Sequence, residues 1–218
     1  MIKKYIYIII CWICSFSVFG SPSDSIKSVY ADGEFQTHYQ KYTTATSGIA
    51  KDVAEYLMSD FHNAPEHLFE WALKDLGLQN KSNELIIIFK SSTDDLKTGV
   101  THGVFDIIVP HFTTFNNVKV DAIVSRTRYT NGSIKVTANI IYSSLLLKNA
   151  VATIMFIPQK NNHLQLVTDV KINFGWFFNF FITKRRYKSI VEWRIKKFTE
   201  NIVEECEMRQ MLLVKDSK

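Results

Sequence analysis

Two segments near the middle of the chain alternate between apolar and polar residues. In residues 118–124 the apolar positions are Val118, Val120, Ala122 and Val124, and residues 134–140 repeat the pattern with Ile134, Val136, Ala138 and Ile140. A period of two residues is typical of a β-strand that has one covered face and one solvated face. We therefore predict two strands that turn their apolar residues to the same side of a sheet.

The turn between these strands follows from their register. Asn131-Gly132 is a strong hairpin signal. A two-residue turn would pair Val124 with Asn139 and mismatch the two faces. A three-residue turn with Gly132 in the left-handed region pairs Val124 with Ala138 and keeps one face apolar. We predict the three-residue turn.

The remaining patterns predict further strands and three helices. Strands are expected at residues 34–46, 85–89, 100–109, 151–157 and 164–174. Ser47 is expected to cap a helix with the apolar stripe Ile49, Val53, Leu57 and Phe61. A second helix should begin at Pro65 and end at Gly77. Thr183 should open a long helix with the stripe Tyr187, Ile190, Val191, Ile195, Phe198, Ile202 and Cys206.

This order of elements predicts the α+β class. We expect a curved antiparallel sheet of about six to seven strands, two short helices near the N-terminus and a long C-terminal helix packed on the sheet. The domain should span residues 34–209, after a polar, flexible lead-in at 21–33 and before a tail at 210–218.

The order of elements resembles that of the START-like, or helix-grip, superfamily over most of the chain that follows the leader. The resemblance implies a sheet that wraps around a C-terminal helix and encloses an apolar cavity. Two other folds come close to this order. A cone of the NTF2-like type also starts with helices but usually ends on strands, and a lipocalin lacks the N-terminal helix pair.

The first 20 residues have the pattern of a signal peptide. Lys3 and Lys4 precede an apolar run, and Val18 and Gly20 are small enough for signal peptidase to cleave before Ser21. The run is shorter than the roughly 20 residues that span a bilayer. A lipoprotein signal is disfavoured because Cys11 and Cys14 lack small residues before them. We expect a periplasmic or secreted protein.

Removing this leader changes the charge and the cysteine count. Of the 26 basic residues two lie in the leader, which leaves 24 against 21 acidic residues and a net charge of +3. Such a modest charge argues against nucleic acid as a partner. Cys206 is the only cysteine that follows the leader, so no intrachain disulfide is expected.

Two pairs of polar residues are candidates for ligand contacts. His102 and Asp106 are four apart on one predicted strand and would form an acid/base pair inside a cavity if that face is covered. Arg126 and Arg128 continue the apolar face of their strand, where two guanidinium groups can hold a carboxylate or phosphate head group. For both pairs, plain solvation is the competing interpretation.

The sequence indicates no metal site and no cofactor. His62 and His67 lie five apart across a helix break, and no third ligand completes a set around them.

The most unusual segment is rich first in aromatic and then in basic residues. Its members are Trp176, Phe177, Phe178, Phe180, Phe181, Lys184, Arg185, Arg186 and Lys188. Consecutive aromatics cannot all be buried on one face, and cations at a helix N-terminus oppose the helix dipole. The segment is predicted to be a lid over the cavity, a contact with an anionic membrane, or both, and plain packing in the core is the competing interpretation.

We derive three hypotheses for the function. The first is a non-enzymatic protein that holds a lipid or other hydrophobic small molecule between sheet and helix. The second is an interaction protein that docks on a membrane through residues 174–197. The third is a cavity enzyme of unknown reaction that uses His102 and Asp106.

Overall fold

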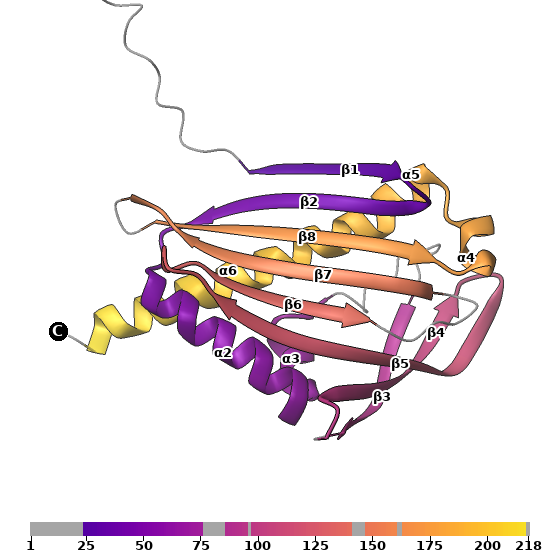
Figure 1. Ribbon diagram of the computed structural model, residues 1–218, viewed down its shortest axis with the longest axis horizontal. Coiled ribbons are helices and arrows are strands. Elements are labelled where there is room, and N and C mark those ends of the chain that lie inside the picture. The colour runs from indigo at the N-terminus through magenta and orange to yellow at the C-terminus, as the bar shows by residue number, and fades with distance from the viewer. Residues whose placement is uncertain (1–23, 76–85, 96, 141–146, 161–162, 217–218) are drawn as a thin grey trace, which may run out of the picture.

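The protein is described by a computed structural model over residues 24–75, 86–95, 97–140, 147–160 and 163–216. Within these residues eight antiparallel strands form one curved sheet in the order β1-β2-β8-β7-β6-β5-β4-β3 (Figure 1). The strands are β1 (Ser25–Ala31), β2 (Glu34–Thr43), β3 (Ile86–Asp95), β4 (Val100–Val109), β5 (Thr113–Arg128), β6 (Ile134–Ile140), β7 (Leu147–Pro158) and β8 (Leu164–Phe174).

The β5–β6 hairpin has the predicted three-residue turn. Val124 pairs with Ala138. The backbone N–H of Tyr129 donates to the carbonyl of Ser133 at 2.9 Å. Gly132 has a φ of 82°, which a side chain would oppose. The apolar faces of the two strands are therefore aligned as their sequences predict.

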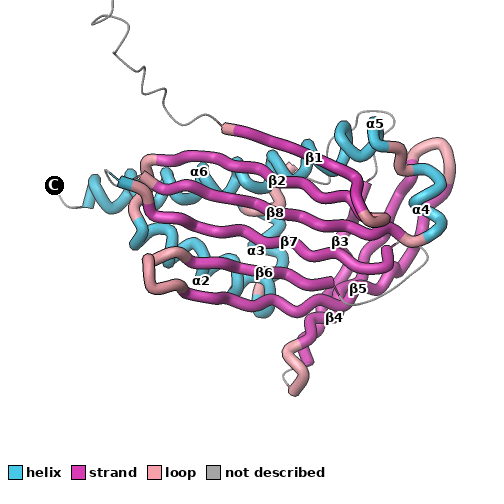
Figure 2. The backbone as a smooth tube through the Cα atoms, turned by 45° about the horizontal axis from the view of Figure 1, so that its top comes forward, coloured by secondary structure: helices cyan, strands magenta, loops and turns pink. Residues whose placement is uncertain are grey.

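Helices cover one face of this sheet (Figure 2). The early pair is α2 (Ser47–Asn63) and α3 (Pro65–Trp71), and the predicted stripe of α2 buries Ile49, Val53 and Leu57. The predicted cap was one residue late, since Thr46 is the N-cap and Ser47 is the first helical residue. The predicted helix end at Gly77 lies outside the described residues.

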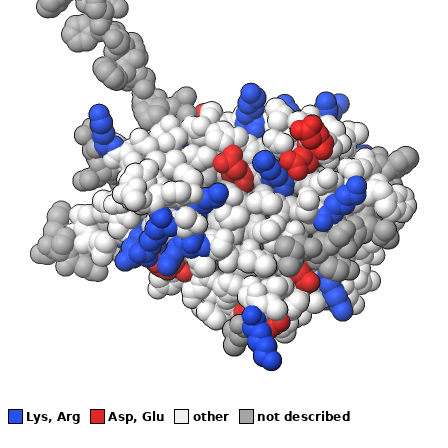
Figure 3. Space-filling view, viewed as in Figure 1, with Lys and Arg blue, Asp and Glu red and all other residues white. Residues whose placement is uncertain are grey.

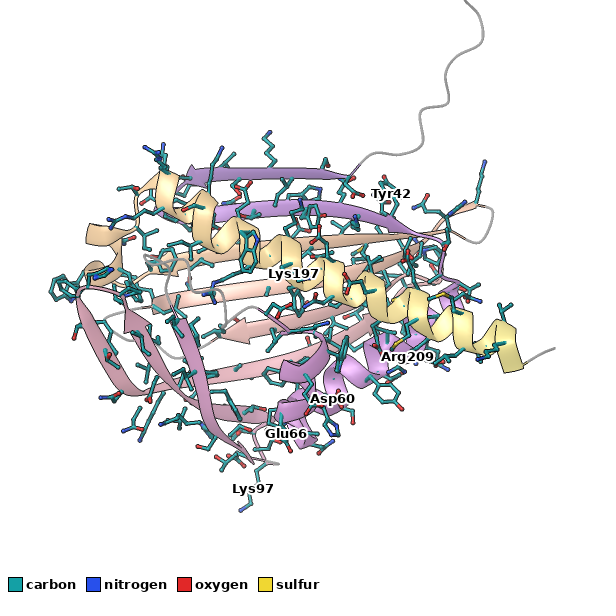
Figure 4. The ribbon with its side chains drawn as sticks, turned by 180° about the vertical axis from the view of Figure 1, so that it is seen from behind. Tyr42, Asp60, Glu66, Lys97, Lys197 and Arg209 are labelled. Atoms are coloured by element: carbon teal, nitrogen blue, oxygen red, sulfur yellow. The ribbon has the colours of Figure 1, made fainter. Side chains whose placement is uncertain are left out.

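The C-terminal helix begins as predicted but is not uniform. The Thr183 side chain accepts a hydrogen bond from the backbone N–H of Arg186 and so caps α5 (Lys184–Tyr187). A π-helical turn, η2 (Lys188–Glu192), follows and continues into α6 (Trp193–Asp216). Seen from behind, this helix crosses the whole sheet (Figure 4). None of the described helices is long and apolar enough to cross a membrane.

The structure corrects two predicted boundaries. The lead-in at 21–33 contains β1, which pairs with β2 along its full length. The apolar residues Ile26 and Val29 of this edge strand fall on opposite faces, so its sequence lacks the period of two that marks a strand with one covered face. The tail at 210–218 is helical as far as Asp216, because α6 runs on beyond the sheet (Figure 1).

The closely packed core lies between the sheet, α2 and α6. Sheet residues with less than a tenth of their surface exposed meet Ile202, Val203 and Cys206 of α6 there; they are Ile134, Val136, Ile154, Phe156, Leu164 and Leu166. Asn201 of α6 fixes the end of α3, since its side-chain amide donates to the carbonyls of Ala72 and Lys74 at 3.2 and 3.0 Å. The helices thus form a fixed second layer on the sheet.

Candidate functional site

An apolar cavity of about 320 Å³ lies between the sheet and the helices. Its wall comes from α2, α6, the region of α3 and four central strands. The lining residues are Leu57, Phe61, Leu68, Leu73, Val124, Val136, Ala138, Ala152, Thr153, Ile154, Thr168, Val170, Arg194, Ile195 and Phe198. This is the position that the predicted architecture implies for a cavity.

Small residues on the central strands account for the space. Val124, Ala138, Ala152 and Val170 lie side by side in one row across β5, β6, β7 and β8. The two central positions of this row are alanines, so the sheet approaches the helix layer there without side chains long enough to fill the gap. Both alanines remain partly accessible although they lie on the helix-covered face.

The hydroxyl groups at the cavity wall are hydrogen-bonded within the protein. Thr199 Oγ1 donates to the carbonyl of Ile195 at 2.9 Å, so the Thr168 hydroxyl donates to Thr199 Oγ1 at 2.7 Å. Because these hydroxyl groups are already hydrogen-bonded, they do not need a hydrogen-bond partner from a ligand. Among the lining residues Arg194 is the charged one, and it is half-buried. The wall is therefore suited to a largely apolar molecule.

Arg126 and Arg128 do not line this cavity. Both guanidinium groups form ion pairs with Glu55 of α2, Arg128 at 2.6 Å. They lie at the predicted end of the β5–β6 hairpin, but their carboxylate partner is part of the chain itself. Their position indicates a role in attaching α2 to the sheet rather than in binding a ligand head group.

His102 and Asp106 neither meet each other nor face the cavity. His102 lies between two buried positions of β4, and its ring Nδ1 contacts Asp121 of β5 at 2.7 Å. Asp106 contacts Lys90 Nζ at 3.0 Å. The placement of these residues does not support the predicted acid/base pair. His102 with Asp121 resembles His38 with Asp169, a second exposed cross-strand pair at 2.7 Å.

The pKa of Asp106 is held below its ordinary value because its carboxylate accepts a hydrogen bond from the backbone N–H of Asn117 and a second from Lys90. A depressed pKa in the folded state stabilises the protein above about pH 4, and this stability is lost as pH falls through the folded-state pKa. We expect Asp106→Asn to lower the free energy of unfolding at neutral pH. The deficit should shrink below about pH 4.

Urea unfolding at neutral and acidic pH measures this difference. Asp52→Asn, on the exposed side of α2, is the control for the same side-chain change outside this hydrogen-bonded site. A deficit of Asp106→Asn that stays constant from neutral to acidic pH would contradict the assignment.

The segment predicted to be a lid or a membrane contact is divided between core and surface. Trp176, the first residue of α4 (Trp176–Phe181), is 67% exposed, whereas Phe178 is 7% exposed. The Phe178 ring packs against those of Phe115 and Phe174. The side chains of Phe177, Phe180 and Phe181 lie outside the described part of the structure. Those of Lys184, Arg185, Arg186 and Lys188 are exposed.

Metal and thiol chemistry find little support in the described residues. No group of three His, Cys, Asp or Glu side chains there could hold a metal ion. His62 contacts Thr101 Oγ1 at 3.1 Å. Cys206 is buried, and burial raises the pKa of its thiol to about 12, so it remains protonated at neutral pH.

Comparison with known proteins supports the architecture through structure rather than sequence. No family model matches the sequence. No curated protein matches it either. Among solved structures, the di-domain ARO/CYC protein StfQ of the steffimycin biosynthetic pathway superposes with a TM-score of 0.52 at 10% identity, over 82% of this chain and 52% of that one. This chain therefore spans about half of the di-domain protein.

Two lipid transfer proteins superpose less closely. Human StAR-related lipid transfer protein 5 gives a TM-score of 0.45 at 10% identity, covering 96% of both chains. The STAR-related lipid transfer protein of Xanthomonas axonopodis gives 0.46 at 10% identity, over 85% of this chain and 99% of that one. The curved antiparallel sheet, the early helix pair and the long C-terminal helix across the sheet establish that the chain has the helix-grip fold.

Proposed function

We propose that this chain is an exported, non-enzymatic binding protein for a lipid or another hydrophobic small molecule. The observation that carries the proposal is the apolar cavity between the sheet and α6. Its volume of about 320 Å³ lies at the lower end of the range for small-molecule sites. Burial of apolar surface in such a site supplies the main driving force for binding.

The chemistry of the wall selects against polar substrates. The hydroxyls of Thr168 and Thr199 are satisfied by each other and by a backbone carbonyl. A polar ligand would lose its hydration without gaining new partners at these groups. Because Arg194 is charged and the rest of the wall is apolar, the wall suits an apolar ligand with one polar end. A fatty acid or a similar amphiphile has this combination.

An enzymatic role for His102 and Asp106 has no comparable support. His102 is on the solvated face of the sheet and Asp106 is held by Lys90 and Asn117. Since neither side chain lines the cavity, a substrate in the cavity would not meet them. Binding is therefore the function that the geometry favours.

Recovery of the bound molecule tests the proposal. The full chain is expressed in a host that exports it, and the protein purified from the exported fraction is extracted with organic solvent. We expect mass spectrometry to find a hydrophobic compound in near-stoichiometric amount. We also expect saturable binding of cis-parinaric acid, a fluorescent fatty acid, to the extracted protein. An extract without such a compound, together with no saturable binding of the probe, would overturn the proposal.

The exported and cytoplasmic fractions of the same culture test export separately. If the chain is cleaved at the predicted site, the intact mass of the exported protein equals that of the chain starting at Ser21. Retention of the unprocessed chain in the cytoplasm would remove export from the proposal and leave ligand binding untouched.

A further inference from the structure

Three exposed aromatic side chains collect at one end of the molecule. Tyr30 lies near the end of β1, Phe112 in the turn between β4 and β5, and Trp176 at the start of α4; their exposed fractions are 43%, 57% and 67%. Figures 1 and 2 show these three places at the same end of the sheet, opposite the C-terminus. Aromatic residues that are far apart in the sequence thus lie at the same end of the molecule.

A continuous series of ring contacts runs across this end of the molecule. The ring centroids of Tyr30 and Phe35 are 4.7 Å apart, and those of Phe35 and Phe174 are 5.9 Å apart. Phe178 then connects Phe174, at 6.1 Å, to Phe115, at 6.3 Å. Phe115 is three residues after Phe112, so these ring contacts connect the β1–β2 end to the start of β5, next to the turn that carries Phe112.

Basic residues follow the segment that carries Trp176, and one of them contacts the ring of Tyr30. Lys184, Arg185, Arg186 and Lys188 follow α4 directly, and all four side chains are exposed. Lys184 Nζ lies 5.8 Å from the centroid of the Tyr30 ring. The β1–β2 turn contributes two acids, Asp32 and Glu34, so cations outnumber anions in these segments. We call the surface formed by Tyr30, Phe112, Trp176 and these four basic residues the aromatic-basic end.

The positive charges of the aromatic-basic end do not stabilise the helix that carries them. Cations at a helix N-terminus oppose the helix dipole. The rings of this region that pack inside the fold are Phe178 and Tyr187, at 7% and 1% exposure. An external anionic surface accounts for both the basic residues and the rings that stay in water.

We propose that the aromatic-basic end docks on an anionic lipid bilayer. Tyrosine and tryptophan favour the head-group region, where the apolar part of the ring is covered and the polar atom stays hydrated. Lysine and arginine near the bilayer surface gain from the negative potential of anionic lipids. The contact needs no ligand in the cavity, so it can be tested whether or not the proposed ligand binding holds.

Co-sedimentation with vesicles tests the docking. We expect the exported chain to bind vesicles of mixed phosphatidylcholine and phosphatidylglycerol, and not vesicles of phosphatidylcholine alone. Added salt should weaken the binding because it screens exposed charges. Arg185→Glu combined with Lys188→Glu should reduce the binding at least about tenfold, and Trp176→Ala should also reduce it.

Matched controls separate a specific surface from net charge and from misfolding. Lys51→Glu combined with Lys97→Glu changes the net charge equally but acts at the start of α2 and at the β3–β4 turn (Figure 4 labels Lys97), and it should leave the binding nearly unchanged. Each variant is checked for an unchanged circular dichroism spectrum and melting temperature.

Tryptophan quenching by brominated lipid gives a second readout. Brominated phosphatidylcholine in the mixed vesicles should quench the fluorescence of the wild type more than that of Trp176→Phe. The proposal is overturned if the mixed vesicles do not bind the protein, if both pairs of charge reversals weaken binding equally, or if Trp176→Phe is quenched as strongly as the wild type.

Discussion

Ala138→Phe or Ala152→Phe should lower the affinity of the protein for cis-parinaric acid by more than about tenfold and leave the fold intact. Ala138 and Ala152 lie side by side at the centre of the row that floors the cavity. A phenyl ring at either position would project into the space that the ligand is proposed to occupy. Because that space is not filled by other side chains, the ring should cause little of the strain that overpacking of a dense core produces. Titration of the extracted protein with the probe measures the affinity.

Asn139→Phe is the matched control for Ala138→Phe. Asn139 is the next residue of β6 and is exposed on the opposite face, so the same ring there cannot enter the cavity. The control should bind the probe as the wild type does. If Ala138→Phe and Ala152→Phe both bind it with wild-type affinity, the ligand does not occupy the cavity between sheet and α6.

Phe156→Ala should have the largest effect on stability and lower the free energy of unfolding by about 3–5 kcal/mol. The Phe156 side chain is 1% exposed and belongs to the closely packed core between sheet, α2 and α6. Its cross-strand neighbours Ile134 and Leu166 are also buried. Truncation removes apolar contacts and leaves a void that these neighbours cannot fill. Urea unfolding followed by circular dichroism gives the value.

Met155→Ala separates this effect from the general cost of shortening a strand residue. Met155 precedes Phe156 on β7 and points to the opposite, helix-free face, where it remains partly exposed. We expect the Met155 variant to lose much less stability. Equal losses at the two positions would show that the core is not concentrated beneath the helices.

The elements predicted best are those in which a local pattern and a buried face coincide. The β5–β6 register followed from one Asn-Gly turn and two alternating strands, and the observed pairing of Val124 with Ala138 confirms it. The helical stripe of α2 was equally clear. β1 was missed because an edge strand is stabilised by hydrogen bonds to its neighbour, and its apolar residues Ile26 and Val29 do not share one face.

The site was predictable in kind but not in its residues. The face on which Arg126 lies was predicted correctly, but its partner Glu55 is distant in sequence and reaches it only through the packing of α2. His102 was placed by periodicity without knowledge of which face of β4 is covered. The alanine pair was the missed signal, since two small residues on the apolar side of neighbouring strands mark a place where a sheet leaves space.

The exposed aromatics show the same limit at the surface. Trp176 stood out because five further aromatics lie around it in the sequence. Tyr30 and Phe112 did not, since neither belongs to a run of consecutive aromatic residues. Only the sheet order, which brings the ends of β1, β4 and β8 to one side of the molecule, identifies them as parts of one surface.

The π-helical turn between α5 and α6 sets the rotational phase of the two helices. In an uninterrupted α-helix the eight steps from Tyr187 to Ile195 would leave the two side chains about 80° apart around the axis. The wider turn at Lys188–Glu192 absorbs one residue's worth of rotation, and both side chains are buried, at 1% and 7% exposure. The π-helical turn thus inserts one residue between α5, which carries the cations, and α6, which carries the cavity-lining residues. The side chains of α5 are rotated around the helix axis relative to those of α6 by the amount that this residue adds. Without this insertion the cations of α5 would be turned by about 100° around the helix axis relative to the face of α6 that packs on the sheet.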